Sequence, residues 1–257
     1  MARGMETNDI PVSYVTACKE SSSYRVGKAF AKGCNGLVSG DLEELLPGPF
    51  AAFCVTEIHP LWRKAKMAKR TWYYGDHAYF KRKVYYRFTK NAMQHDCSGE
   101  ATPHRFEKLG VKIKPWSKKG SKILIAPQSD IFYALMGLNK LRWLEEVKRQ
   151  IKKVSDREII VREKASGFYA EQQFEEALLD IWAVVCFMSA AGMQAALHGV
   201  PCFATHECVS QKFGSGDLSR IENPVYPDDR ERMAWVLADN QWTIPELERG
   251  LAWEKLR

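Results

Sequence analysis

Residues 189–203, with the sequence SAAGMQAALHGVPCF, have the residue types and the spacing of an anion-binding helix start. The apolar run before them predicts a buried strand, and Ser189 can cap the helix that follows. The small side chains of Ala190, Ala191 and Gly192 would let an anion approach the free N–H groups of the first helical turn. The same small side chains would also allow close packing of a core helix, so the segment by itself leaves both roles open.

Residues 63–90 combine basic and aromatic side chains at high density. Ten lysines and arginines stand against one acid, Asp76, so the local charge of about +9 exceeds the +7 of the whole chain. Such a mixture suits phosphate contacts together with base stacking, whereas most charge runs are only solvated faces. We therefore expect this segment to bind an anionic polymer. The expected contact residues are Arg63, Lys64, Lys69, Arg70, Trp72, Tyr74, Lys81, Arg82, Lys83 and Arg87.

Asp76 and His77 lie in the middle of this segment, in the sequence GDHAY. A carboxylate or an imidazole can take the proton from an attacking hydroxyl group. We expect Asp76 to be such a base, His77 to be the second candidate, and His59, which follows a predicted strand, to be the third. A loop cap or a salt bridge with Arg87 is the alternative role for Asp76.

Short, continuous apolar runs alternate with helical patterns in both halves of the chain. Residues 11–18, 50–56 and 122–127 predict buried strands, because their apolar residues follow one another instead of alternating with polar ones. Residues 139–154 predict an amphipathic helix, with apolar side chains at three- and four-residue spacing. This alternation is typical of parallel sheets with helices on both faces.

The predicted fold class is therefore α/β, with two small Rossmann-like domains facing each other across a cleft. We expect residues 1–115 to form the first domain and residues 116–257 the second, since the polar, basic residues 95–122 resemble a linker. In open sheets of this kind, ligands bind at the carboxyl ends of the strands.

Composition and cysteine usage exclude several classes of protein. With 46% hydrophobic and 27% charged residues, the chain is not disordered, collagen-like or a coiled coil. Seven singly spaced cysteines fit reduced thiols in a cytoplasm better than a disulfide framework. No Asp-x-Asp motif and no Cys/His ligand pair is present, so we expect no metal ion.

Residues 181–205 contain no charged side chain and are long enough to cross a bilayer. Glycine, proline and polar residues interrupt this stretch, and its flanks are acidic instead of basic. We expect it to be buried core, and we expect no transmembrane segment and no signal peptide.

The segment that begins at Ser189 resembles the donor-binding segment of two-domain, GT-B-type glycosyltransferases, which has the pattern S-x-x-x-x-E-A-L-x-x-G-x-P after a strand. It is most similar to the branch that contains the capsule-polysaccharide and CDP-glycerol transferases. The resemblance implies that the helix start binds the diphosphate of a nucleotide sugar. Gln194 departs from the pattern, since many members have at this position a Glu that binds ribose or sugar hydroxyls.

Other features of residues 122–257 resemble the same family. Residues 126–129 match a small polar loop that faces the donor, and residues 159–164 resemble a strand with a KPHP segment whose His-Pro is missing here. The terminal helices around Trp242 and Trp253 resemble those that cross back onto the first domain. The resemblance implies a donor site made of Gln128, Ser129, Arg162, Lys164, Ser189, Ala190, Ala191, Gly192 and Gln194.

The resemblance implies a metal-independent glycosyltransferase that uses a nucleotide sugar as co-substrate and needs no other cofactor. The basic segment suggests DNA as partner and a hydroxylated base as acceptor, as in phage DNA modification in the host cytoplasm. A cytoplasmic capsule or cell-surface polysaccharide transferase is the first alternative, with the basic surface facing anionic phospholipid. A non-catalytic nucleic-acid-binding protein on the same fold and a nucleotide-sugar epimerase are the others. The oligomeric state is left open.

Overall fold

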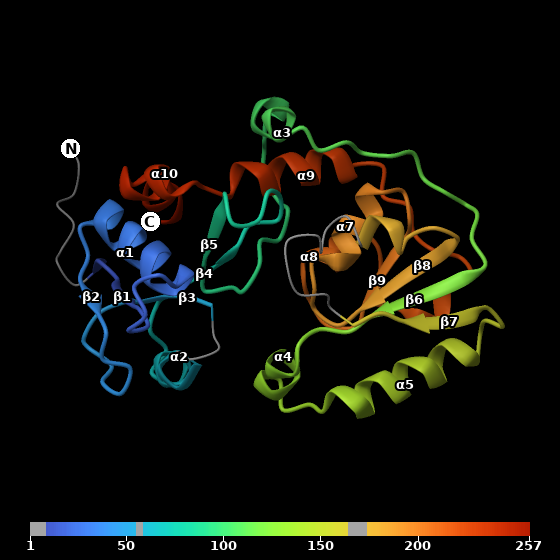
Figure 1. Ribbon diagram of the computed structural model, residues 1–257, viewed down its shortest axis with the longest axis horizontal. Helices are drawn as coiled ribbons and strands as arrows, with labels where there is room; N and C mark the ends of the chain where they lie inside the picture. Colours follow the sequence, from blue (N-terminus) through green and yellow to red (C-terminus); the bar gives the residue numbers. More distant parts are fainter. Residues whose placement is uncertain (1–8, 55–58, 164–173) are drawn as a thin grey trace. The chain divides into compact units, whose positions relative to one another are not determined.

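The computed structural model describes residues 9–54, 59–163 and 174–257, and the chain folds into two compact units (Figure 1). Unit 1 comprises Met1–His95 and Val236–Arg257, and unit 2 comprises Asp96–Trp235. The chain therefore enters unit 2 after His95 and returns to unit 1 within helix α9 (Arg230–Asp239). The boundary that we expected from the sequence lay between residues 115 and 116.

Unit 1 contains a five-stranded sheet with the strand order β2-β1-β3-β4-β5. The first four strands in this order are parallel, and β5 is antiparallel to β4. The strands are β1 (Val12–Tyr14), β2 (Val38–Ser39), β3 (Phe50–Phe53), β4 (Trp72–His77) and β5 (Tyr86–Lys90). The predicted buried strands at residues 11–18 and 50–56 are confirmed as β1 and β3, whereas the sequence analysis did not identify the β4–β5 pair.

Helix α1 (Ser22–Cys34) packs against the C-terminal helices α10 (Ile244–Glu248) and α11 (Leu251–Leu256). The Ser21 hydroxyl caps α1 by accepting a hydrogen bond from the Tyr24 N–H. Gly33 permits a close approach of the helices, because a Cβ atom there would lie 2.0 Å from the Leu247 carbonyl oxygen. Trp242 and Trp253 are buried in the core that these helices share with β3, β4 and β5.

Unit 2 contains a four-stranded, fully parallel sheet with the order β7-β6-β8-β9. The strands are β6 (Lys122–Ala126), β7 (Glu158–Val161), β8 (Ile181–Cys186) and β9 (Cys202–Ala204). The helices of this unit whose bounds lie within the described residues include α3 (Pro103–Leu109), α4 (Asp130–Leu135), α5 (Lys140–Lys152), α7 (Ala191–Leu197), α8 (Val209–Lys212) and the 3₁₀ helix η2 (Leu218–Arg220). Two α/β units with parallel strands confirm the predicted fold class.

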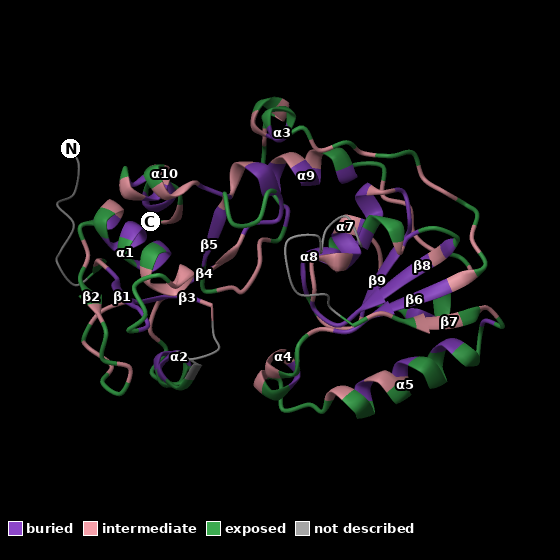
Figure 2. Ribbon diagram, in the orientation of Figure 1, coloured by how far each residue is buried: buried purple, intermediate pink, exposed green. Residues whose placement is uncertain are grey.

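Strands β6, β8 and β9 are largely buried, as Figure 2 shows. Helix α5 is amphipathic, as predicted, and buries Trp143, Val147 and Ile151. Residues 181–205 form β8, α7 and β9, so this uncharged stretch is the core of unit 2. Across the described ranges, no helix is both long enough and apolar enough to cross a membrane.

Candidate functional site

The loops that follow the strands of unit 2 meet at one edge of its sheet, because all four strands are parallel. This carboxyl edge carries four of the residues that the resemblance implied for the donor site, and two residues that follow β9. The six residues are Gln128 and Ser129 after β6, Arg162 after β7, Ser189 after β8, and Thr205 and His206 after β9. Lys164 lies outside the described residues.

The start of α7 offers an anion fewer free donors than the sequence predicted. The Ser189 hydroxyl accepts a hydrogen bond from the Ala191 N–H at 3.2 Å, and the Ser210 hydroxyl accepts one from the Met193 N–H at 2.8 Å. A Cβ atom on Gly192 would lie 2.7 Å from the Ser210 Cβ, so Gly192 permits close packing against α8. The geometry thus supports the packing role that the sequence analysis had left open for these small residues.

Ala190 and Gln194 complete the predicted donor segment. Ala190 precedes α7 and is half-buried, and its carbonyl oxygen accepts the Gln194 N–H at 3.0 Å. Gln194 is half-buried in the middle of α7, and its carbonyl oxygen bonds to the His198 ring at 2.9 Å. The His198 ring also lies 3.1 Å from the Glu175 carboxylate. These contacts link α7 to the rest of unit 2.

Two cations, Arg162 and Lys164, were predicted to bind phosphate, and Arg162 lies within the described residues. Its N–H donates to the Ile125 carbonyl at 2.9 Å, which extends the pairing of β6 with β7. The guanidinium lies 5.5 Å from the centroid of the Phe174 ring. The neighbouring Glu163 is paired with Lys140 at 2.6 Å. Half-buried and held by the sheet, Arg162 can present its charge at the carboxyl edge.

A cluster of aromatic rings lies at the same edge, and the sequence analysis missed it. The Phe187 ring has three aromatic neighbours, Tyr133, Trp143 and His206, with centroids 4.3, 5.8 and 4.1 Å away. Trp143 Nε1 donates a hydrogen bond to Thr205 Oγ1 at 2.8 Å. Burial lowers the pKa of His206, and the backbone of Thr205 opposes this shift in part. The position of His206 directly after a predicted strand is the signal that could have revealed it.

Gln128 is bound to this cluster through its backbone. Its N–H donates to Tyr133 Oη at 3.2 Å. Its side-chain Oε1 atom is buried and accepts no hydrogen bond from any residue in the described ranges. Ser129 occupies the N-cap position of α4 but makes no side-chain capping hydrogen bond. The Ser129 side chain is exposed at the carboxyl edge, whereas Gln128 Oε1 is a buried acceptor whose hydrogen bond is unmet among the described residues.

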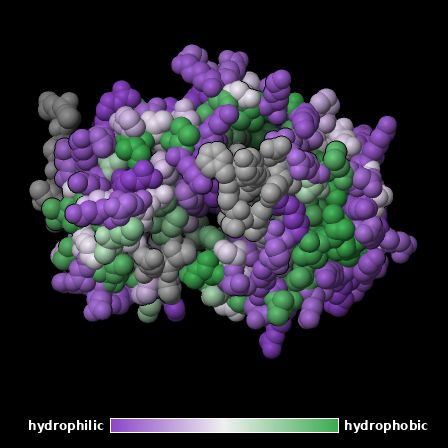
Figure 3. Space-filling model, viewed as in Figure 1, coloured by the Kyte–Doolittle hydropathy of each residue, from purple (hydrophilic) through white to green (hydrophobic). Residues whose placement is uncertain are grey.

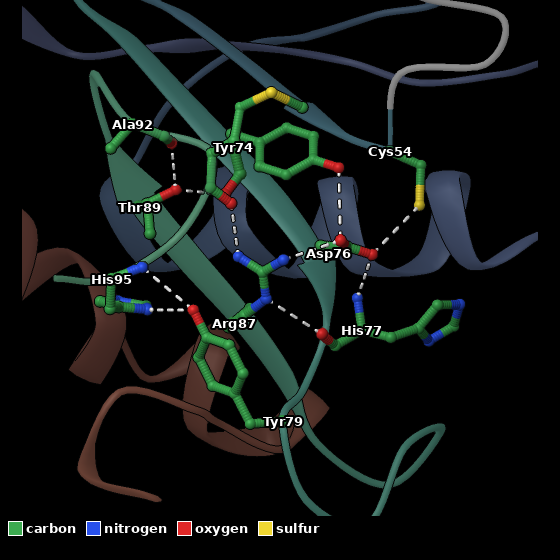
Figure 4. Close-up of polar contacts among 10 residues, drawn as sticks. Cys54, Tyr74, Asp76, His77, Tyr79, Arg87, Thr89, Ala92 and His95 are labelled. Carbon is green, nitrogen blue, oxygen red and sulfur yellow. Dashed lines mark hydrogen bonds and ion pairs between the residues drawn. The ribbon is translucent and has the colours of Figure 1, made fainter. Parts of the chain in front are cut away.

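In unit 1, Asp76 is the centre of a hydrogen-bonded network (Figure 4). Asp76 Oδ2 lies 2.8 Å from Arg87 Nη2 and 3.3 Å from Tyr74 Oη. Asp76 Oδ1 accepts from the His77 N–H at 2.7 Å and from Cys54 Sγ at 3.9 Å. Burial, and then the charge of Asp76, raise the pKa of the Cys54 thiol, so the thiol keeps the proton that it donates.

Arg87 is buried, with 5% of its side chain exposed, and its remaining donors bind backbone carbonyls. Nε donates to the His77 carbonyl at 3.2 Å and Nη1 to the Met93 carbonyl at 2.6 Å. The geometry thus realises the alternative role of Asp76, a salt bridge with Arg87. The Asp76 side chain is 22% exposed.

His77 and His59, the other two candidates for the base, also belong to unit 1. The His77 ring is half-buried and packs edge-on against Phe53, with centroids 5.4 Å apart. His59 is the first residue of α2 (His59–Met67), and its side chain lies outside what the structure describes.

The basic segment does not form the aromatic-lined surface that we predicted. Trp72, Tyr74 and Arg87 are buried, because β4 and β5 pair within the sheet and their side chains fill the core on both faces. Aromatic rings in such a core cannot stack on bases. Contact of these three residues with an anionic polymer stays a prediction, and their burial gives it no support.

The remaining cations of the segment are separated into two groups by the length of β4. Arg63, Lys64 and Lys69 precede the strand, and Lys81, Arg82 and Lys83 follow it, all with exposed side chains. Arg70 is half-buried, and its guanidinium donates to the Leu46 and Gly48 carbonyls. The view in Figure 3 shows a surface on which hydrophilic side chains predominate.

The cysteines are reduced, and the structure shows no metal-ligand group among the described residues. All seven cysteines are free thiols, and five of them are buried. Over residues 9–54, 59–163 and 174–257, no three His, Cys, Asp or Glu side chains are grouped so that they could hold a metal ion.

Two solved structures share the fold of this chain. The first is the β-Kdo 2,4-transferase of Thermosulfurimonas dismutans KpsC, with a TM-score of 0.54 and 10% sequence identity over 91% of this chain and 92% of that one. The second is the β-Kdo 2,7-transferase of the same KpsC, with a TM-score of 0.53 and 10% identity over 96% of this chain and 100% of that one. The fold is therefore GT-B-like, as the resemblance implied.

No protein-family model matches the chain, and no curated protein matches it.

Proposed function

We propose that the protein is a glycosyltransferase that moves a sugar from a nucleotide-sugar donor to a hydroxyl group. The observation that carries this proposal is the GT-B-like fold. The similarity to the β-Kdo 2,4-transferase structure extends over 91% of the chain. In open α/β sheets, ligands bind at the carboxyl ends of the strands. In unit 2, that edge collects Arg162, Ser129 and the buried Gln128 Oε1 atom, a set that suits a nucleotide.

In the proposed reaction, the acceptor oxygen forms a bond with the anomeric carbon of the donor sugar. The bond between this carbon and the phosphate oxygen breaks, and its electron pair stays on the nucleotide. Arg162 would stabilise the negative charge that develops on the leaving phosphate. Lys164 is a second cation of the proposed site, and the start of α7 would contribute less because its first-turn donors at Ala191 and Met193 already have partners. We propose that this charge stabilisation needs no divalent cation.

The acceptor hydroxyl loses a proton in this step, and a base in unit 1 would accept it. Asp76 is the first candidate, since 22% of its side chain is exposed although its oxygens accept four hydrogen bonds. His77 is the second candidate and His59 the third. In this proposal, Arg87 holds the Asp76 carboxylate in a fixed orientation.

A glycan or glycolipid acceptor is favoured over DNA by the basic segment itself. Its aromatic side chains at Trp72 and Tyr74 are buried, so base stacking loses its support, and its exposed cations are divided among α2, the turn before β4, the turn before β5 and the end of β5. Both similar structures are named as Kdo transferases. We therefore propose a cell-surface polysaccharide or a lipid-linked precursor, made in the cytoplasm, as the acceptor, and retain a hydroxylated DNA base as the second candidate.

A thermal-shift panel tests the proposed function. The full-length chain is heated with UDP-, GDP-, CMP- and CDP-linked sugars, and at least one of them should raise the melting temperature by mass action. Arg162→Ala should weaken this stabilisation, whereas Arg149→Ala, an exposed change on α5, should leave it unchanged. If no nucleotide sugar stabilises the wild-type chain, the transferase proposal fails and a non-catalytic binding protein is favoured. Donor turnover without any acceptor would identify an epimerase instead.

A further inference from the structure

Three aromatic rings lie in a row at the carboxyl edge of unit 2. The Tyr133 and Phe187 rings are stacked, with centroids 4.3 Å apart and 20° between their planes. The next ring, His206, lies 4.1 Å from Phe187 and is tilted by 51° against it. Tyr133 and Phe187 are buried, whereas His206 is half-buried. The imidazole is therefore the end of the stack that a ligand can reach.

The imidazole is held by the sheet. The His206 N–H donates to the Phe187 carbonyl at 3.1 Å, and the Thr205 N–H donates to the Cys186 carbonyl at 3.1 Å. The Thr205 hydroxyl accepts the hydrogen bond from Trp143 Nε1. Because these bonds extend the β8–β9 ladder, the ring is positioned before any ligand binds, which reduces the cost of ordering it.

Gln128 adds a polar group beside the same stack. Its backbone bond to Tyr133 Oη fixes the residue next to the first ring. Its Oε1 atom is buried and has no donor among the residues that the structure describes. A buried carbonyl oxygen without a donor is unfavourable, so a ligand N–H at this position would relieve that cost.

A nucleobase has the two features that suit the His206 ring and Gln128 Oε1. It has a flat π-face, which stacks on an aromatic side chain, and it has N–H groups on its edge. The lowered pKa of His206 keeps its ring neutral near pH 7, which suits stacking on a neutral base. Arg162 lies after β7, at the opposite end of the strand order, where it would face the phosphates.

Resting on the proposed donor site, we infer that His206 stacks on the nucleobase of the donor nucleotide and that Gln128 Oε1 accepts a hydrogen bond from an N–H of this base. His206 and Gln128 are thus the specificity-determining residues of unit 2. Tyr133 and Phe187 support the imidazole from below and do not touch the ligand.

Calorimetric titration of the full-length chain tests this inference. The probes are CMP, UMP, GMP and AMP, together with ribose 5-phosphate, which has the sugar and the phosphate but no base. We expect the wild-type chain to bind at least one nucleotide more tightly than ribose 5-phosphate. His206→Ala should lower the affinity for that nucleotide at least about fivefold and leave the affinity for ribose 5-phosphate unchanged. Gln128→Leu should likewise lower the affinity for the nucleotide and not the affinity for ribose 5-phosphate.

Two further variants make the test specific. His206→Phe keeps a flat ring and should restore most of the affinity that His206→Ala loses. His198→Ala removes another half-buried histidine of unit 2 and should bind as the wild-type chain does.

The outcomes separate this inference from the proposed function. If Arg162→Ala loses affinity while His206→Ala and Gln128→Leu bind like the wild-type chain, the base subsite is refuted and the donor site stands. Equal affinity for nucleotides and ribose 5-phosphate would refute it as well. If the wild-type chain binds none of the five probes, the donor site itself is refuted.

Discussion

Arg87 and Asp76 are direct partners across the β4–β5 ladder, and their side chains form an ion pair at 2.8 Å. Both partners are mostly buried, with 5% and 22% of their side chains exposed. An ion pair in this setting is costly to break, because removal of one partner leaves the other charge without compensation.

Asp76→Asn should therefore lower the free energy of unfolding by about 3 kcal/mol. Chemical denaturation of the full-length chain, followed by fluorescence of the tryptophans, measures the change. Glu248→Gln is the control, since it breaks an exposed pair with Lys32 and should cost less than about 1 kcal/mol. Equal effects of the two substitutions would show that the Asp76 pair does not stabilise unit 1.

Gly192→Ala should destabilise unit 2 without removing any ligand contact. The new Cβ atom would meet the Ser210 Cβ at 2.7 Å, and such overpacking costs about 1–3 kcal/mol. Gly40→Ala is the matched control, because an added Cβ atom there meets nothing within 4 Å. If Gly192→Ala folded with wild-type stability but lost nucleotide binding, the anion-binding role of this helix start would be restored.

Acid should destabilise the wild-type chain in part through His206. Burial holds the pKa of this residue below its ordinary value of 6.5, so the unfolded state binds more protons than the folded state as the pH falls below about 6.5. Stability is thus present at neutral pH and lost on acidification towards the folded-state pKa. Melting temperatures at pH 7.5 and pH 5.5 should differ less for His206→Phe than for the wild-type chain. An unchanged difference would show that another group causes the acid sensitivity.

The exposed cations of residues 63–90 form one group before β4 and one group after it. Replacement of either group should have the same weak effect on DNA binding. We expect shallow salt dependence for the wild-type chain, since the slope scales with the number of phosphates neutralised together, and the exposed cations of the segment are divided between residues before β4 and residues after it. The triple variants at Arg63, Lys64 and Lys69 and at Lys81, Arg82 and Lys83 remove equal charge from opposite ends of β4. Gel-shift titrations at 50 and 200 mM salt measure the effect. Steep salt dependence that only one variant abolishes would favour a DNA acceptor.

The sequence revealed the strands of the core but not the arrangement of the basic segment. Continuous apolar runs identify a buried strand directly, and this succeeded for Phe50–Phe53 and Lys122–Ala126. In residues 63–90, the high charge hid two strands, because lysines at the two ends of β4 and in the turn before β5 dominate the composition. The pairing of β4 with β5 is a tertiary contact, and within this pair the aromatic side chains of both strands are buried.

The position of the proposed donor site at the carboxyl edge of unit 2 could be predicted from the sequence. The residues that form this edge could be predicted only in part. Strand ends at Ala126, Val161 and Cys186 lead to the loops that the resemblance identified. The rings of Tyr133 and His206 come from segments 73 residues apart in the numbering, and no local pattern connects them to Phe187. The bonding of Ser210 to the α7 backbone is likewise a tertiary contact that spacing alone does not reveal.

Release of free nucleotide during sugar transfer tests the central claim most directly. The full-length chain is incubated with each nucleotide sugar and with glycan, glycolipid or hydroxymethylated DNA acceptors, and the products are separated by mass spectrometry. The account predicts one donor whose sugar appears on an acceptor hydroxyl, with loss of at least about 90% of the rate in Arg162→Ala, equivalent to about 1.4 kcal/mol of transition-state stabilisation. An unchanged rate in Arg162→Ala, or no transfer from any donor to any acceptor by a chain that is folded, would contradict it.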